Sequence, residues 1–167
     1  EDYDLWLRLA AAGRIDHVAE ALVAYRLHEH NLSRDREAHR RCEREILNKR
    51  AVQDIRAALI DVHVAPARTD LALSQVLFRM ERYAEGEALL RRIDPDERDR
   101  AVRHFLLGNF AVKRDDVGAA AAEYHLCLCC DPAFAPAHNN LGVIGALHAR
   151  RHPSLEHFAR AVALRPG

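Results

Sequence analysis

The sequence predicts a mainly α-helical chain that ends in a stack of helical hairpins. Helix-favouring Ala, Leu, Arg and Glu are frequent among the 167 residues, whereas Gly occurs only 7 times. In the second half, apolar residues recur at spacings of three and four, as on one face of a helix. The same half also repeats itself at an interval of 34 residues, which indicates a repeat architecture.

Charge and composition argue against several classes of protein. The 25 Lys and Arg residues balance the 25 Asp and Glu residues, so the zero net charge gives no basis for a nucleic-acid partner. No apolar run approaches the ~20 residues that a membrane span requires, and no signal peptide is evident. Three of the 4 Cys residues crowd into 127–130, unlike a secreted disulfide framework, so we expect a cytoplasmic protein.

The first segment, residues 1–35, predicts a small α/β remnant. An acidic pair, Glu1 and Asp2, opens a helix that a glycine ends. Two short strand-like stretches follow, 15–18 and 21–27, and the second merges into the run YRLHEHNLS. These features separate the opening of the chain from the repetitive second half.

An acidic pair at a helix start, followed by Tyr-Arg-x-His-x-x-Asn-x-Ser after a strand, resembles the C-terminal part of family-two (GT-A-type) glycosyltransferases. The resemblance implies that Asp2, with Glu1 beside it, takes the proton from an acceptor hydroxyl. The reaction would be an inverting sugar transfer from a nucleotide-sugar donor to a glycan or protein acceptor. It also implies that His28 contributes to the site of a divalent cation, Mg²⁺ or Mn²⁺, at the diphosphate.

The chain begins at Glu1 without an initiator Met, and it lacks that family's other metal-holding acidic motif and its nucleotide-binding strands. We therefore interpret it as a fragment of a longer glycosyltransferase, inactive by itself. The alternative is a non-enzymatic scaffold whose first residues only cap the repeats. An acidic pair at a helix start is favourable in its own right, because the helix dipole stabilises negative charge there.

The connecting region, 36–66, predicts one long helix from about residue 34 to 62, with Ser33 as its N-cap. Its apolar stripe consists of Ala38, Cys42, Ile46, Ala51, Ile55, Leu59 and Val62. Its first part is rich in Arg, but interleaved Asp and Glu residues favour a salt-bridged, solvated face over a nucleic-acid patch. Pro66 ends this region before the first repeat.

The repetitive half divides into three units, 67–100, 101–134 and 135–167. Residues 34 positions apart correspond as follows: Leu107 and Leu141, Gly108 and Gly142, Tyr124 and Phe158, Cys127 and Ala161, Pro132 and Pro166. The Pro at the end of a unit must stop a helix, since an interior Pro would lose a backbone hydrogen bond. The Gly allows a close approach. Each unit is therefore expected to form two short helices.

This pattern resembles the tetratricopeptide repeat (TPR), with its 34-residue period, Leu-Gly pair, late aromatic residue and closing Pro. Gly86, Ser154 and Gly145 depart from the family's preferences. The resemblance implies an α-solenoid whose first helices line a groove for a peptide or protein partner, without a cofactor. By position, the groove residues would be Asn109, Lys113, Asn140 and Val143.

Cys127, Cys129 and Cys130, with His125 nearby, suggest a possible metal site. The cluster lacks the paired spacing of a zinc site, however, and Cys127 takes a small buried position of the repeat. The sequence therefore favours Cys127 as a core residue. His148, His152 and His157 are scattered around the last predicted hairpin and are not expected to form a ligand pair on one helix face.

Overall fold

The structure is a computed structural model that describes residues 36–60, 66–94, 96–148 and 151–164. The helices in these ranges are α2 (Arg36–Asn48), α3 (Val52–Ile60), α4 (Pro66–Arg79), α5 (Tyr83–Arg92), α6 (Glu97–Lys113), α7 (Val117–Cys130), α8 (Ala135–Leu147) and α9 (Arg151–Leu164). The described ranges contain no strand, and the predicted α-helical fold class is confirmed. The predicted α/β segment, 1–35, lies outside the described residues.

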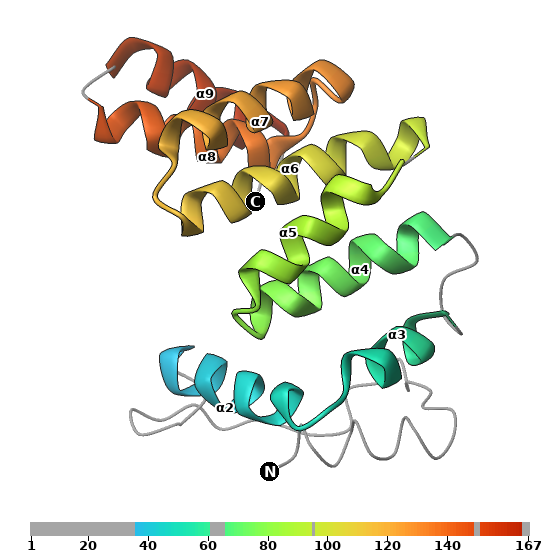
Figure 1. Cartoon of the computed structure of the whole chain (residues 1–167). Helices are drawn as coiled ribbons and strands as arrows, with labels where there is room; N and C mark the ends of the chain where they lie inside the picture. Colours follow the sequence, from blue (N-terminus) through green and yellow to red (C-terminus); the bar gives the residue numbers. More distant parts are fainter. Residues whose placement is uncertain (1–35, 61–65, 95, 149–150, 165–167) are drawn as a thin grey trace, which may run out of the picture.

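The six helices α4 to α9 form three hairpins, α4–α5, α6–α7 and α8–α9, which stack side by side (Figure 1). The first two hairpins turn in the same way. Glu81 and Asp115, which are 34 residues apart, both adopt a φ of 60° between the two helices of their hairpin. The side chain of Asp116 then accepts a hydrogen bond from the backbone N–H of Ala119 at 2.9 Å and caps α7. The first two repeats therefore share the backbone conformation of this turn as well as their sequence pattern.

The helices also begin and end close to residues that cap or stop a helix. α7 ends at Cys130, two residues before Pro132, as an obligatory stop requires. α6 begins at Glu97, inside the predicted first unit, because Asp96 accepts a hydrogen bond from the backbone N–H of Asp99 at 3.1 Å. The polar stretch that ends the first unit is therefore the N-cap of the next helix.

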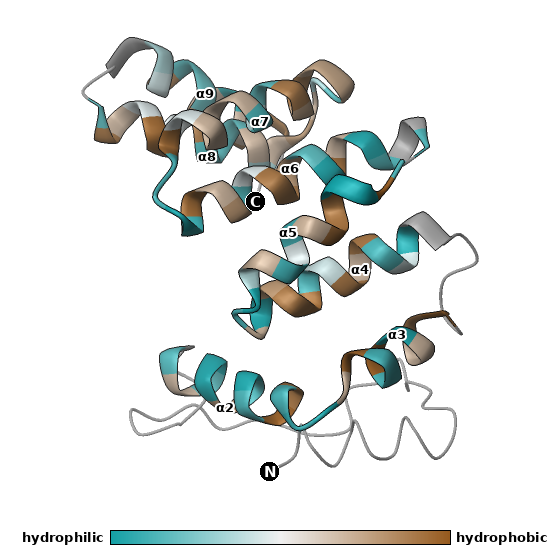
Figure 2. Ribbon diagram, viewed as in Figure 1, coloured by the Kyte–Doolittle hydropathy of each residue, from teal (hydrophilic) through white to brown (hydrophobic). Residues whose placement is uncertain are grey.

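The hydrophobic core lies between the hairpins. Leu90, Phe110, Tyr124 and Cys127 are among its fully buried side chains. Figure 2 shows apolar residues interspersed with polar ones along the helices rather than gathered in continuous runs. No helix among the described residues is long and apolar enough to cross a membrane.

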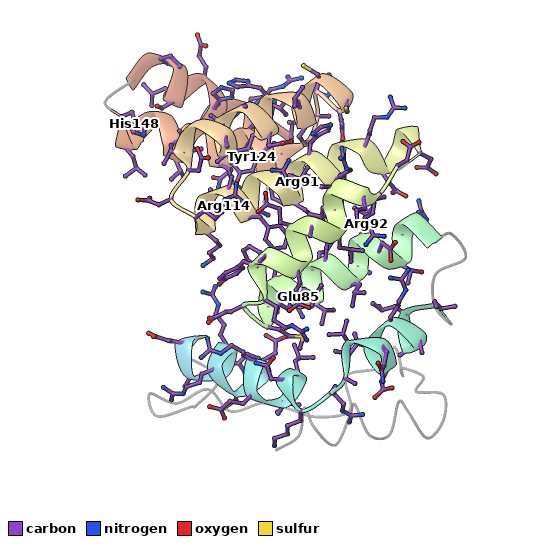
Figure 3. The ribbon with its side chains drawn as sticks, in the orientation of Figure 1. Glu85, Arg91, Arg92, Arg114, Tyr124 and His148 are labelled. Atoms are coloured by element: carbon purple, nitrogen blue, oxygen red, sulfur yellow. The ribbon has the colours of Figure 1, made fainter. Side chains whose placement is uncertain are left out.

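Gly86 departs from the Ala that TPR sequences prefer, and the packing explains why. A Cβ atom at this position would lie 2.6 Å from Cζ of Phe110, a buried ring on the next hairpin. Glycine therefore lets the first two hairpins approach closely. An ion pair between Glu87 of α5 and Arg114, which follows α6, reinforces this contact at the surface. Glu87 also pairs with Arg91 on its own helix, and Figure 3 labels both arginines.

The prediction of one long helix in the connecting region was wrong, because α2 and α3 are separated by a turn at 49–51. In the predicted apolar stripe, Ile46 and Ala51 are five positions apart, which breaks the three-to-four spacing of a helix face. The turn lets both halves of the stripe reach α4 (Figure 1). Cys42 and Ala51, which were assigned to the stripe, are exposed.

The helices α2 and α3 together cover the first hairpin. Leu47 of α2 is buried in one cluster with Leu73, Leu77 and Met80, and apolar residues of α3 pack against that cluster. Three charged residues of the region pair with the hairpin: Glu43 with Arg79 at 2.9 Å, Arg44 with Glu81, and Arg56 with Asp70 at 2.7 Å. The predicted salt-bridged face is therefore a set of contacts between elements.

Candidate functional site

The predicted groove residues lie on two neighbouring first helices, Asn109 and Lys113 on α6 and Asn140 and Val143 on α8. Lys113 is exposed, Val143 is 43% exposed, and both Asn side chains are half-buried. We call these four residues the groove face. Their position allows contact with a partner, and their role in binding stays a prediction.

The structure brings Asn109 and Asn140 together. Nδ2 of Asn140 donates a hydrogen bond to Oδ1 of Asn109 at 3.3 Å, and the hydroxyl of Tyr124 donates to the same oxygen at 2.8 Å. Burial raises the pKa of Tyr124, and the neighbouring Asn140 amide partly opposes that rise. Within the described residues Nδ2 of Asn109 has no hydrogen-bond partner, so one amide donor on this face remains available.

Lys113 makes a different contact, with the turn of the first hairpin. Its Nζ atom lies 5.7 Å from the ring centroid of Phe78 and 5.9 Å from that of Tyr83. Both distances are within the range of a cation–π interaction. The two rings meet edge to face with centroids 5.4 Å apart. Phe78 and Tyr83 therefore hold Lys113 at one end of the groove face.

A cleft of about 730 Å³ opens at this end. Its walls come from α2, from the turn of the first hairpin and from the end of α6: His39, Arg40, Glu43, Phe78, Arg79, Glu81, Tyr83 and Lys113. Burial and the Glu81 carboxylate raise the pKa of Tyr83, so its hydroxyl stays protonated at neutral pH. Sequence reasoning missed Phe78 and Tyr83, because no signal in the sequence places α2 against that turn.

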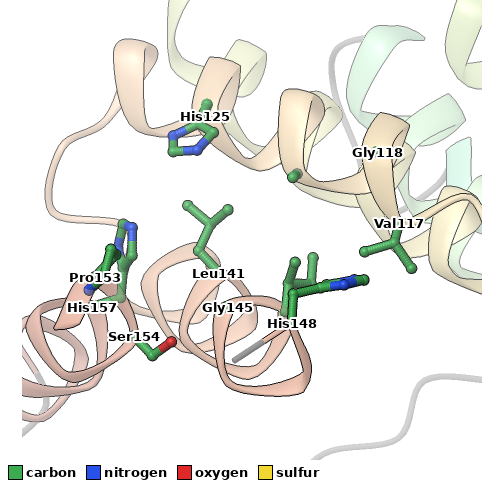
Figure 4. A pocket seen from close by; sticks show the side chains of 11 residues that line it. Val117, Gly118, His125, Leu141, Gly145, His148, Pro153, Ser154 and His157 are labelled. Atoms are coloured by element: carbon green, nitrogen blue, oxygen red, sulfur yellow. The ribbon is translucent and has the colours of Figure 1, made fainter. Parts of the chain in front are cut away.

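A second, smaller pocket of about 340 Å³ lies between α7, α8 and α9 (Figure 4). Three histidines line it: His125 of α7, His157 of α9, and His148, which directly follows α8. Behind it, Nδ1 of His138 lies 3.0 Å from Nδ1 of His157. The sequence analysis missed this pair, because its members are 19 residues apart on two helices of a hairpin.

The partners of the two rings assign their tautomers. Nε2 of His138 lies 3.1 Å from the carbonyl oxygen of Pro132, so it must carry a proton and donate. In neutral His138, Nδ1 is then an acceptor, and Nδ1 of His157 donates to it. Burial, together with the neighbouring His138 and His125, lowers the pKa of His157. These surroundings favour the neutral form of His157.

Metal ligation finds no geometric support in the part of the chain that the structure describes, which contains no group of three His, Cys, Asp or Glu side chains arranged around an ion. Cys127 is fully buried in the core, whereas Cys129 and Cys130 are exposed. Burial raises the pKa of the Cys127 thiol to about 12, and the nearby Asp131 adds to the effect. Cys127 is thus a neutral core side chain, as its place in the repeat predicts.

The residues predicted to act in sugar transfer, Glu1, Asp2 and His28, lie outside the described residues. The groove face and its adjoining cleft therefore form the candidate site.

Comparisons with known proteins bear on the fold. No family model and no curated protein matches the sequence. Among solved structures, the crystal structure of MamA superposes with a TM-score of 0.57 at 16% identity, over 80% of this chain and 81% of that chain. The structure of YrrB, described as a TPR protein with an unusual peptide-binding site, superposes with a TM-score of 0.51 at 21% identity, over 78% of this chain and 62% of that chain.

The fold is a TPR-type α-solenoid. At these identities the likeness shows the fold alone, and the binding sites of the other proteins do not transfer with it. The likeness confirms the repeat architecture predicted from the 34-residue period. It gives no support to the predicted glycosyltransferase segment, which precedes the described helices.

Proposed function

We propose that this chain is a protein-interaction scaffold that binds an extended peptide on the groove face of α6 and α8. The observation that carries the proposal is the contact between Asn109 and Asn140, which places two side-chain amides of neighbouring repeats side by side. An extended peptide presents unpaired N–H and C=O groups, and side-chain amides both donate and accept hydrogen bonds.

The surroundings of the amide pair fit such a partner. Val143 offers an exposed apolar contact on one side, and Lys113 with its two aromatic neighbours offers a cationic and aromatic one on the other. The TPR protein YrrB, which shares this fold, is described as having a peptide-binding site. A cytoplasmic location belongs to the same proposal and is supported by four free Cys side chains.

A selection from a phage-displayed library of random peptides tests this function. Peptides enriched on the 167-residue chain are measured by calorimetry against the parent sequence and against Asn140→Ala. We expect Asn140→Ala to weaken binding by about tenfold, since it removes an amide while Asn109 keeps its bond to Tyr124. Cys129→Ala, an exposed site on α7, is the matched control and should leave the affinity unchanged.

Selection of no peptide would contradict the proposal. So would peptides that bind Asn140→Ala and the parent sequence equally well, because such peptides occupy another surface. Circular dichroism of the variant separates a local loss of contacts from unfolding.

Sugar transfer by a longer parent protein is a second proposal, and it rests on the motif in 1–35 alone. In that parent, Asp2→Asn removes the proposed base and should lower turnover by about a hundredfold with little effect on donor binding. His28→Ala should weaken metal-dependent donor binding as well. Normal turnover of Asp2→Asn would end the assignment of Asp2 as the base, and Glu1 would become the next candidate.

A further inference from the structure

α9, the last helix that the structure describes, has an apolar face that nothing covers within the described residues. Leu155 and Val162 are 67% and 68% exposed, and Ala159, which lies between them on the same side of α9, is exposed too. The spacings of four and three place the three side chains in one row along the helix. We call this row the outer face of α9.

The equivalent helix of the preceding hairpin, α7, shows what kind of element can cover such a face. Ala121 and Leu128 of α7 stand 34 residues before Leu155 and Val162, and they pack against a cluster that includes Ala137 and Leu141 of α8. In the preceding hairpin, therefore, the same positions are covered by a helix. The outer face of α9 has the side chains and the spacing to receive a helix in the same way.

A head-to-tail arrangement of copies would need the face at the other end of the stack. That face is occupied, because α2 and α3 cover the first hairpin and bury Leu73, Leu77 and Met80. The outer face of α9 therefore cannot pair with the first hairpin of another copy unless α2 and α3 leave. A closed pair that uses one patch on both copies avoids this conflict.

The outer face is self-complementary in an antiparallel pairing. With a twofold axis near residues 158 and 159, Leu155 of one copy meets Val162 of the second copy, and Val162 meets Leu155. Ala159 lies close to the axis, where its small side chain lets the two helices approach. Glu156 then comes near Arg160 of the second copy, so the charges beside the apolar row attract on both sides of the axis.

We propose that two copies of this chain associate through an antiparallel contact between their α9 helices. This surface is separate from the groove face, so the dimer goes beyond the proposed function and leaves the peptide site open. A single helix pair buries less than the ~1,200 Å² of a standard stable interface, so the dimer is weak and reversible.

Sedimentation velocity of the 167-residue chain tests this proposal. Between about 1 µM and about 1 mM, the range of weak association, the molar mass should rise from that of the 18.9 kDa monomer toward twice that value. Leu155→Glu and Val162→Glu should each raise the dissociation constant at least about tenfold, because two charges would face apolar side chains across the axis. Leu126→Glu, at a 46% exposed site on α7, is the matched control and should dimerise like the parent sequence.

A charge exchange tests the direction of the pairing. Glu156→Arg alone and Arg160→Glu alone should each weaken the dimer by about twofold to fivefold, the scale of exposed ion pairs. The double variant, which restores opposite charges across the axis, should regain the affinity of the parent sequence. Circular dichroism confirms that each variant keeps its helices.

Three results would overturn the proposal. One is a monomer over the whole concentration range. Another is a dimer that Leu155→Glu and Leu126→Glu weaken equally. The third is a pair of single charge variants whose losses add in the double variant, since this would exclude the antiparallel contact.

Discussion

The hairpins α6–α7 and α8–α9 bring the same pairs of positions into contact and fill them with different residues. In the first, Nδ1 of His104 lies 2.7 Å from Oε2 of Glu123, within hydrogen-bond distance. In the second, the residues 34 positions later are His138 and His157, whose Nδ1 atoms lie 3.0 Å apart. One hairpin thus joins its helices by an imidazole and a carboxylate, which attract each other when the imidazole is protonated. The other joins them by two imidazoles, which repel each other when both are protonated.

The aromatic residue that packs over the glycine differs in a similar way. Tyr124 packs over Gly108, is only 1% exposed, and donates its hydroxyl hydrogen to Asn109. Phe158 packs over Gly142, is half-buried, and has no hydroxyl. The repeat therefore preserves an apolar frame, whereas the contacts that fix it differ between units. From these contacts we expect α8–α9 to be the less stable hairpin.

Truncation of the two aromatic rings should show the largest difference. Tyr124→Ala should lower the free energy of unfolding by about 3–5 kcal/mol, the usual cost of removing a fully buried aromatic ring. Phe158→Ala should cost about 1–2 kcal/mol, because the ring is partly in water already. Urea denaturation followed by circular dichroism measures both. Equal losses would show that the two hairpins are equally well packed.

Much of the fold was predictable because several of the residues that define the repeat constrain the backbone at their own position, whatever surrounds them. Pro132 stops a helix wherever it stands, and Gly108 permits an approach that any Cβ would block. Cys127 was placed in the core by its register alone. The break between α2 and α3 was missed because it depends on which residues of α4 the stripe meets. That contact is tertiary. The only sign of it in the sequence was the spacing of five positions between Ile46 and Ala51 in the stripe.

The candidate site was less predictable for a related reason. Register places Asn109 and Asn140 on equivalent faces, but it does not say that their amides touch. Phe78 and Tyr83 join the site only because the first hairpin turns toward Lys113 and α2 closes the cleft. His138 and His157 meet across a hairpin, so no spacing within one helix reveals them. These features depend on contacts between helices, whereas a sequence motif describes the residues of one helix at a time.

Substitution of Gly108 and Gly142 should also lower the free energy of unfolding more in α6–α7 than in α8–α9, but by a smaller margin than the aromatic truncations. At Gly108 an added methyl group would collide with the Tyr124 ring, which burial and its hydrogen bond hold in place. Gly108→Ala should therefore lower the free energy of unfolding by about 1–2 kcal/mol, even after the gain in helix propensity. At Gly142 the methyl group would lie 2.8 Å from the ring of Phe158, which has room to move toward solvent.

For Gly142→Ala we therefore expect a change of no more than about 0.5 kcal/mol, since helix propensity offsets the contact. Thermal unfolding of the two variants at one protein concentration provides the comparison. A loss at Gly142 as large as that at Gly108 would show that Phe158 is held as rigidly as Tyr124.

The smallest expected effect concerns pH and the histidine pair. The pKa of His157 is lowered in the folded chain from its ordinary value of 6.5 by burial, His138 and His125, while Glu156 acts in the opposite direction. Below pH 6.5 the unfolded chain therefore takes up a proton that the folded chain resists, so this residue's contribution to stability falls as the pH falls.

The variant His157→Glu replaces the histidine pair by a histidine and a glutamate, as in the contact between His104 and Glu123. At pH 5.5 the variant should be more stable than the parent sequence by about 0.5 kcal/mol, the scale of a partly exposed ion pair, and the gain should shrink toward pH 8, where an imidazole is ordinarily neutral. His157→Gln, which removes the second imidazole without adding a charge, is the control. Urea titrations at pH 5.5 and pH 8 measure the difference, and a gain for His157→Glu that is the same at both values would exclude an ion pair with His138.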